Sequence, residues 1–371
     1  NRNRVHIGVS NFNGIYPGTV SNSLLSCQNQ SGALSVLNPP LTNQSTSTAI
    51  IAINVKRFDL GTNLSINTTG NTLRFANILY LGRNSGLKTH NTNFINPLNW
   101  NNPLPAAGGL LNPTTGIGIW IQNIPSAINP STQMVECIIG GHNADEPCNF
   151  VGVSGVSNNT TGAGIFTNGN INSTIISNNF SNLRYGIIQN NMTGYLLAGT
   201  MPMQNETYVY NNTLNKSELA GIYAVNNNRA YIRYIANTFN NTFDRGIYVA
   251  NVAEMQSSAL IQRNLIFGES LTTGIHLVNF KRSVIDNNEV TYNAATNGYY
   301  PNSSIFRHGI RAQNCSHVRI TNNLIQRSNQ NDNSFTNTNF DKLRGISLAS
   351  SVMANICNNR CFVLGTGIRS E

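Results

Sequence analysis

The sequence predicts an all-β protein built as a parallel β-solenoid, in which short strands wind into stacked coils. Of the 371 residues, 40% are hydrophobic, only 10% are charged and 64 are Asn. Abundant Asn, Gly, Thr and Ser disfavour helices, and this much hydrophobic sequence disfavours a charged, disordered chain. Gly-Ile dipeptides also recur along the chain, and each begins a segment in which apolar and variable residues alternate.

The Gly-Ile segments are the first predicted strand family. They begin at Gly118, Gly164, Gly186, Gly221, Gly246, Gly274, Gly309, Gly345 and Gly367. From Gly164 onward their spacing varies between 22 and 36 residues, which indicates constant strands joined by loops of variable length. An apolar residue at every second position is typical of a half-buried strand. We therefore expect these strands to pair in parallel in one sheet, with the isoleucines stacked inside.

An Asn recurs at the fifth position after the Gly of most Gly-Ile segments. Such an Asn can turn the chain through a left-handed conformation, and stacked copies can hydrogen-bond to one another as a ladder. The predicted structural ladder consists of Asn226, Asn251, Asn279 and Asn314.

A second strand family lies between the Gly-Ile segments and has the pattern Ile-x-Asn-Asn-x-apolar, as in 285–290 and 320–324. Two or three short strands per coil, inward isoleucines and variable loops resemble the right-handed parallel β-helix superfamily. This superfamily includes pectate-lyase-like proteins and secreted bacterial surface proteins. The resemblance covers roughly residues 110–371 and implies a right-handed parallel β-helix. Because unrelated functions share this fold, it implies no single activity.

The repeat also predicts the domain organisation. Residues 111–371 are expected to form the regular parallel β-helix, with a continuation into a longer chain left open. Residues 1–110 are expected to form an N-terminal cap and irregular early β coils, because the ends of a solenoid are usually atypical. A separate small β domain is the alternative for this region. The polar stretch 329–339 is expected to be a protruding loop.

The composition fits a secreted or cell-surface protein, and the cysteines add little to this. The net charge of +9 comes mainly from 18 Arg and favours an anionic partner such as an acidic polysaccharide. No basic run or nucleic-acid module occurs, so a nucleic-acid partner is not expected, and no apolar run is long enough for a transmembrane segment. Among the six cysteines, Cys137 with Cys148 and Cys357 with Cys361 could form disulfides, whereas Cys27 and Cys315 lie too far apart in the repeat order. The chain begins without Met and ends within a Gly-Ile segment, which predicts a processed chain or a segment of a longer one.

The resemblance also directs attention to catalytic motifs. Lyases of the superfamily hold calcium with clustered acidic residues, but this chain has 14 acidic residues and no such cluster. The segments typical of polygalacturonase-like and epimerase-like members are also absent, and Gly141-His142-Asn143 matches a Gly-His-Gly segment only in part. We therefore expect no metal and no other cofactor.

One edge of the solenoid could still carry chemistry, because charged residues collect in the turns before the Gly-Ile strands. The residues that could act in catalysis are Asp244, Glu269, His308 and Asp341. Asp244 and Glu269 are expected one coil apart, within the range of carboxylate separations used by glycosidases. The alternative is a row of surface salt bridges, each weakly stabilising.

The variable position of the Gly-Ile strands must face outward if its neighbours face inward. It is expected to form a ligand-binding platform of Trp120, Tyr223, Tyr248, His276 and Arg311. Aromatic rings suit sugars, and Arg311 supplies a positive charge for an acidic sugar. The alternative is that loops cover these rings.

These features together favour a non-catalytic extracellular or cell-surface module, adhesin-like or filament-like, that binds a glycan or a surface-protein partner. Such a module could belong to a larger surface assembly. The alternative function is a carbohydrate-active enzyme, a polysaccharide lyase or glycoside hydrolase, that uses the carboxylates before the Gly-Ile strands. A purely structural spacer is the third hypothesis.

Overall fold

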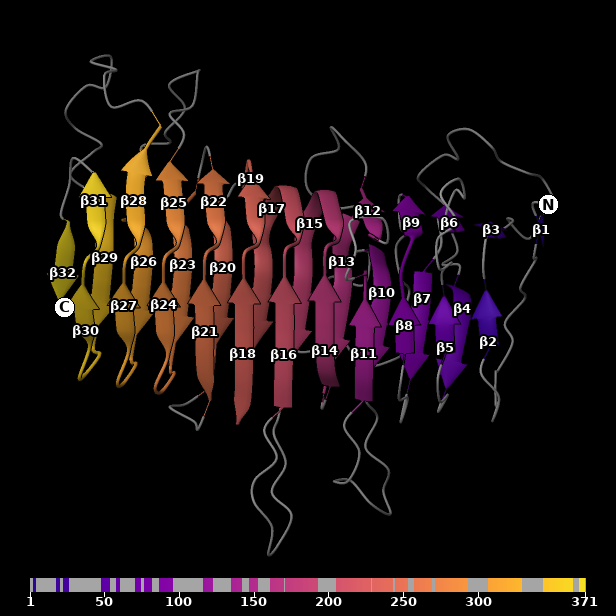
Figure 1. Cartoon of the computed structure of the whole chain (residues 1–371), viewed down its shortest axis with the longest axis horizontal. Coiled ribbons are helices and arrows are strands. Elements are labelled where there is room, and N and C mark those ends of the chain that lie inside the picture. Colours follow the sequence, from indigo (N-terminus) through magenta and orange to yellow (C-terminus); the bar gives the residue numbers. More distant parts are fainter. Residues whose placement is uncertain are drawn as a thin grey trace, which may run out of the picture. The chain divides into compact units, whose positions relative to one another are not determined.

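The structure is a computed structural model. It describes residues 3–4, 18–20, 23–26, 48–53, 58–60, 71–74, 77–81, 87–95, 116–122, 135–141, 147–152, 161–169, 171–192, 205–227, 229–242, 244–252, 257–268, 271–292, 306–328, 343–362 and 367–370. The chain divides into two compact units, Asn1–Asn190 and Asn191–Glu371, called here the N-terminal and C-terminal units. Within each unit the strands lie side by side in successive coils (Figure 1).

Each coil of the C-terminal unit contributes one strand to each of three parallel columns. The third column, in coil order, contains β16 (Asn205–Tyr210), β18 (Ala230–Ile235), β21 (Ser258–Gln262), β24 (Val284–Asp286), β27 (Arg319–Thr321) and β30 (Asn355–Cys357). The second column contains the first part of β17 (Thr213–Val225), then β19 (Thr238–Asn240), β22 (Leu265–Gly268), β25 (Glu289–Tyr292), β28 (Leu324–Arg327) and β31 (Arg360–Phe362). The Gly-Ile column contains the last part of β17, then β20 (Arg245–Ala250), β23 (Thr273–Val278), β26 (Arg307–Gln313), β29 (Leu343–Ala349) and β32 (Ile368–Ser370).

The described strands of the N-terminal unit follow the same succession. Its third column contains β2 (Gly18–Val20), β5 (Phe58–Leu60), β8 (Leu87–Thr89), β11 (Val135–Ile139) and β14 (Ile171–Ile176). Its second column contains β1 (Asn3–Arg4), β3 (Ser23–Ser26), β6 (Asn71–Arg74), β9 (Thr92–Ile95), β12 (Asn149–Val151) and the first part of β15 (Asn179–Asn190). Its Gly-Ile column contains β4 (Thr48–Ile53), β7 (Asn77–Leu81), β10 (Gly116–Gln122), β13 (Thr161–Asn168) and the last part of β15.

The repeated isoleucines are register partners inside the coils, as predicted. In the C-terminal unit Ile222, Ile247, Ile275, Ile310, Ile346 and Ile368 are paired in turn, and all but the last are fully buried. Ile119, Ile165 and Ile187 form the same buried row in the N-terminal unit. Burying each side chain contributes about 1.5–3 kcal/mol, so the row is a main source of cohesion between coils.

A close approach of two columns requires a Gly before the Ile at seven described positions: Gly118, Gly164, Gly221, Gly246, Gly274, Gly309 and Gly345. A Cβ on Gly246 would lie 2.6 Å from the carbonyl oxygen of Gly274 in the next coil and 2.7 Å from Cγ2 of Ile266 in the second column. Gly118 is equally crowded, by the carbonyl oxygen of Gly164 and the ring of Phe150. Because Gly has no side chain, an interior residue of the second column, such as Ile266, can pack against the backbone of the Gly-Ile strand.

The predicted all-β class and parallel β-helix architecture are confirmed. The proposed division near residue 110 stays a prediction, and described strands on both sides of it follow the same order of columns. Residues 329–339 lie outside the described residues.

Candidate functional site

The variable position of the Gly-Ile column forms a row of side chains on the outer face of the C-terminal unit. Tyr223, Tyr248, His276, Arg311 and Ser347 are successive register partners from β17 to β29. The first four are half-buried, whereas Ser347 is fully buried. We call the first four side chains, together with Arg245, the outer row.

Aromatic contacts connect the outer row from coil to coil. The rings of Tyr223 and Tyr248 stack with centroids 5.0 Å apart and planes 21° apart, and His276 meets Tyr248 edge to face at 5.2 Å. The guanidinium carbon of Arg245 lies 4.5 Å from the centroid of the Tyr248 ring. Since Tyr223 and Arg245 engage the faces of Tyr248, that ring offers a ligand its hydroxyl group and edge more than a free face. Ring stacking on a sugar, which the sequence favoured, is therefore restricted here.

The outer row carries two arginines, Arg311 at one end and Arg245 over the Tyr248 ring. Arg311 pairs in register with His276 and has no carboxylate within salt-bridge distance among the described residues. Burial lowers the pKa of His276 to about 3, and the charges of Arg311 and Arg245 add to this effect. His276 is therefore neutral near pH 7, and the outer row carries two guanidinium groups beside a neutral imidazole.

Trp120, the fifth predicted platform residue, belongs to the N-terminal unit and is buried. It is 4% exposed and meets Phe166 edge to face, with ring centroids 5.1 Å apart. Phe166 and its register partner Ile188 are fully buried. The N-terminal unit therefore offers a ligand no accessible aromatic ring at Trp120 or Phe166.

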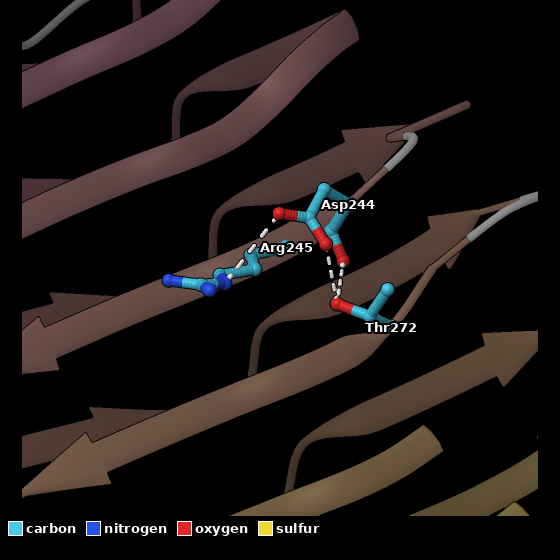
Figure 2. Close-up of polar contacts among 3 residues, drawn as sticks. All are labelled: Asp244, Arg245 and Thr272. Carbon is cyan, nitrogen blue, oxygen red and sulfur yellow. Dashed lines mark hydrogen bonds and ion pairs between the residues drawn. The ribbon is translucent and has the colours of Figure 1, made fainter. Parts of the chain in front are cut away.

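The charged edge of the C-terminal unit contains two described members of the predicted catalytic set, Asp244 and His308, of which Asp244 is the carboxylate. Its carboxylate accepts a hydrogen bond from the hydroxyl of Thr272 and lies 3.5 Å from Nε of Arg245 (Figure 2). The backbone oxygen of Asp244 also accepts a hydrogen bond from the Thr272 amide. Both members of the Asp244–Arg245 pair are about one-third exposed. These contacts are those expected for a stabilised turn.

The other members of that set do not assemble with Asp244 within the described residues. His308 is buried and donates its backbone N–H to Thr272, which places it two coils from Asp244, a distance of about 10 Å at the usual strand spacing. Glu269 and Asp341 lie outside the described residues. The structure thus describes no pair of neighbouring carboxylates on this edge.

The predicted Asn ladder contains one reciprocal pair. Nδ2 of Asn251 donates to the carbonyl oxygen of Asn279, and Nδ2 of Asn279 donates to that of Asn251. Asn226, Asn279 and Asn314 have positive φ values of 50–58°, the left-handed conformation expected at a turn. Asn314 is exposed, and its backbone N–H bonds to Ala349 in the next coil.

A longer ladder lies at a different corner, between the third and second columns. It consists of Asn212, Asn237, Asn264, Asn288, Asn323 and Asn359. Each Oδ1 from Asn237 onward accepts hydrogen bonds from the backbone and side-chain amides of the preceding Asn, as Asn288 does from Asn264 at 3.0 and 2.9 Å. Asn288, Asn323 and Asn359 are the second Asn of the Ile-x-Asn-Asn pattern, and the other three occupy the same position in variants of it. That pattern was visible in the sequence, but its role as a ladder was missed.

Sequence reasoning also missed Arg245 as part of the outer row. The sequence offers no clear signal for this contact, because residues three apart on a regular strand face opposite sides. The structure shows it in the position of the Arg245 guanidinium over the Tyr248 ring.

Cysteines and metal-binding residues offer no second site within the described part of the chain. Cys137, Cys148, Cys315, Cys357 and Cys361 are free thiols, and Cys27 lies outside the described residues. Burial raises the pKa of the Cys137 and Cys148 thiols to about 12, which makes them poor nucleophiles. No group of three or more His, Cys, Asp or Glu in the described ranges could hold a metal ion. Those ranges also contain no helix long and apolar enough to span a membrane.

Comparison with known proteins shows similarity to solved structures alone. No protein-family model matches the sequence, and no curated protein matches it. The surface adhesin PfbA of Streptococcus pneumoniae is 9% identical, over 94% of this chain and 78% of that chain, with a TM-score of 0.45. A mutant of the periplasmic alginate epimerase AlgG is 13% identical, over 93% of this chain and 85% of that chain, with a TM-score of 0.43. The Dettilon tailspike protein is 13% identical, over 83% of this chain and 62% of that chain, with a TM-score of 0.28.

Identity this low concerns the fold and not the activity. The assignment itself rests on the chain's own strand register, in which three columns of parallel strands repeat coil after coil within each unit. By this register the chain is a parallel β-helix protein.

Proposed function

We propose that the protein is an extracellular or cell-surface β-helix module that binds an acidic glycan, without catalysis, along the outer row of the C-terminal unit. The observation that carries the proposal is Arg311, a half-buried cation with no described carboxylate partner, held in register with His276, which itself pairs in register with Tyr248. Arginine recognises carboxylate and sulfate groups through paired hydrogen bonds. The net charge of +9 supports an anionic partner.

The geometry assigns different tasks to the members of the outer row. Arg311 and Arg245 supply positive charge, while Tyr223 and Tyr248 present phenol edges at successive coils, with centroids 5.0 Å apart. Held by stacking and by the Arg245 guanidinium, the two rings lose little conformational freedom when a ligand binds. An extended acidic chain lying across the coils could thus meet charge at one end and hydroxyl groups at the other.

The test is the affinity for acidic oligosaccharides, screened on a glycan array of sulfated, uronic-acid and neutral chains and then measured by calorimetry. Arg311→Gln should weaken binding of an acidic chain by about 10-fold or more, because hydrogen bonds to charged groups contribute about 1.5–3 kcal/mol. Tyr248→Ala should also weaken it, and added salt should reduce the affinity of the unaltered protein.

Two control variants lie on the third column of the same unit. Tyr231 is half-buried with the Arg233 guanidinium 5.2 Å from its ring centroid, which matches the setting of Tyr248. Arg319 is an exposed arginine on β27 and matches the charge removed at Arg311. Tyr231→Ala and Arg319→Gln should leave affinity within about twofold, since neither touches the outer row. Equal losses in variant and control, or release of reducing sugar from the bound chain, would contradict the proposal.

A further inference from the structure

The surroundings of His276 suggest that a proton takes part in ligand binding, an inference that rests on the proposed function. His276 lies on β23 between Tyr248 of β20 and Arg311 of β26. Its Nε2 atom is buried and has no hydrogen-bond partner among the described residues. The imidazole thus has an unused polar atom beside two guanidinium groups, those of Arg311 and Arg245.

We propose that His276 takes up a proton when an acidic group binds beside Arg311. The charged and titratable groups that act on this imidazole from neighbouring strands are Arg245 and Tyr248 on β20 and His308 and Arg311 on β26. None of these supplies a negative charge near neutral pH. These residues therefore place no negative charge beside the imidazole, and a bound anion would supply one.

The sign of the effect follows from the forces on the free site. Burial, Arg311, Arg245 and His308 all lower the pKa of His276, to about 3, and only a hydrogen bond with Gln313 opposes them. An anion within about 4–6 Å of a histidine favours its protonated form and raises its pKa by about one to three pH units. Free His276 is neutral above about pH 3, so protonation in the complex requires a proton from solvent.

Linkage makes the effect measurable as an affinity. A ligand that favours protonated His276 must bind more tightly when His276 is protonated. Affinity is therefore highest below the pKa of the complex, falls as the pH rises through it, and becomes constant once His276 is neutral in both states. A rise of the pKa to about 5 would make affinity at about pH 4 roughly 10-fold higher than at about pH 7.

Calorimetry with a sulfated oligosaccharide tests the proposal, because sulfate keeps its charge throughout this range. Titrations at about pH 4.5 and about pH 7.5, each in two buffers of different ionisation enthalpy, count the protons taken up on binding. We expect a substantial fraction of one proton at the lower pH and almost none at the higher. His276→Gln, which keeps a polar side chain but cannot titrate, should abolish the uptake and flatten the pH dependence.

The outcomes separate this inference from the function on which it rests. Binding without proton uptake at the lower pH, or uptake that persists in His276→Gln, would overturn the inference and leave the glycan site intact. No binding at either pH would overturn both. A second readout avoids substitution: the NMR shift of the His276 ring, followed against pH with and without ligand, should titrate at higher pH in the complex. Coincident curves for a binding ligand would refute the proposal.

Discussion

The outer faces of the Gly-Ile columns differ between the two units, although their interiors are built alike. In the N-terminal unit the outer position holds Trp120, Phe166 and Ile188, which are all buried. In the C-terminal unit it holds Tyr223, Tyr248, His276 and Arg311, which are half-buried, followed by Ser347, which is buried. The interior row of isoleucines is continuous within each unit and is fully buried except at Ile368. The buried isoleucines are thus common to the coils of both units, whereas the outer side chains are buried in one unit and partly exposed in the other.

The largest expected effect comes from truncating the outer position in each unit. Trp120→Ala should lower the free energy of unfolding by about 3–5 kcal/mol, as for other buried aromatic side chains, and leave acidic-glycan affinity unchanged. Tyr248→Ala should lose affinity but cost clearly less stability, because its ring is half-buried. Urea unfolding and calorimetry on both variants test this. Loss of binding in Trp120→Ala, with its fold intact, would break the contrast between the two outer faces.

A second comparison asks whether the two interiors are as similar as their register suggests. Gly118→Ala and Gly246→Ala should each lower unfolding stability by about 3 kcal/mol, because the new methyl group meets a backbone carbonyl that cannot move aside. Gly367→Ala is the control, since its Cβ would lie 3.9 Å from the nearest atom. Thermal or urea unfolding gives the ranking. An unaffected Gly246→Ala variant would show that the corner is looser than the structure indicates.

The smallest of the three effects concerns the corner between the third and second columns. In the C-terminal unit this corner holds the Asn ladder, whereas in one coil of the N-terminal unit Cys148 takes the place of the Asn, with its amide bonded to Oδ1 of Asn178 in the next coil. Asn288→Ala should cost about 2 kcal/mol, since it leaves the buried backbone amide of Asn264 without an acceptor. Cys148→Ala should cost less, because the thiol donates only one weak bond, to the Thr89 carbonyl at 3.4 Å. Equal losses in urea unfolding would mean that the ladder adds little.

The fold was largely predictable because it depends on local, repeated features. An invariant Ile with alternating neighbours determines which face is buried, whatever the length of the loops between copies. The role of the preceding Gly was not predictable, because it arises from Ile266 and its equivalents reaching across from another strand. The structure has the reciprocal Asn251–Asn279 pair at the predicted position and a longer ladder at the corner between the third and second columns, which the sequence could not single out because both corners contain recurrent Asn. Only the three-dimensional course of the chain shows which side chains turn inward.

The candidate site was predictable only in part. Strand alternation placed Tyr223, Tyr248, His276 and Arg311 on one outer face, and the structure brings them together. The same alternation could not distinguish Trp120, because the burial of an outward side chain depends on what covers it and not on its own strand. Arg245 was missed because its contribution depends on a side-chain path over the Tyr248 ring.

The most direct test of the central claim is a crystal structure of the protein with a bound sulfated oligosaccharide. The account predicts a sulfate within hydrogen-bond distance of the Arg311 guanidinium and sugar hydroxyl groups near Tyr248, with no ligand against Trp120. A ligand bound to the third column at Tyr231 and Arg319, or to the N-terminal unit alone, would contradict it.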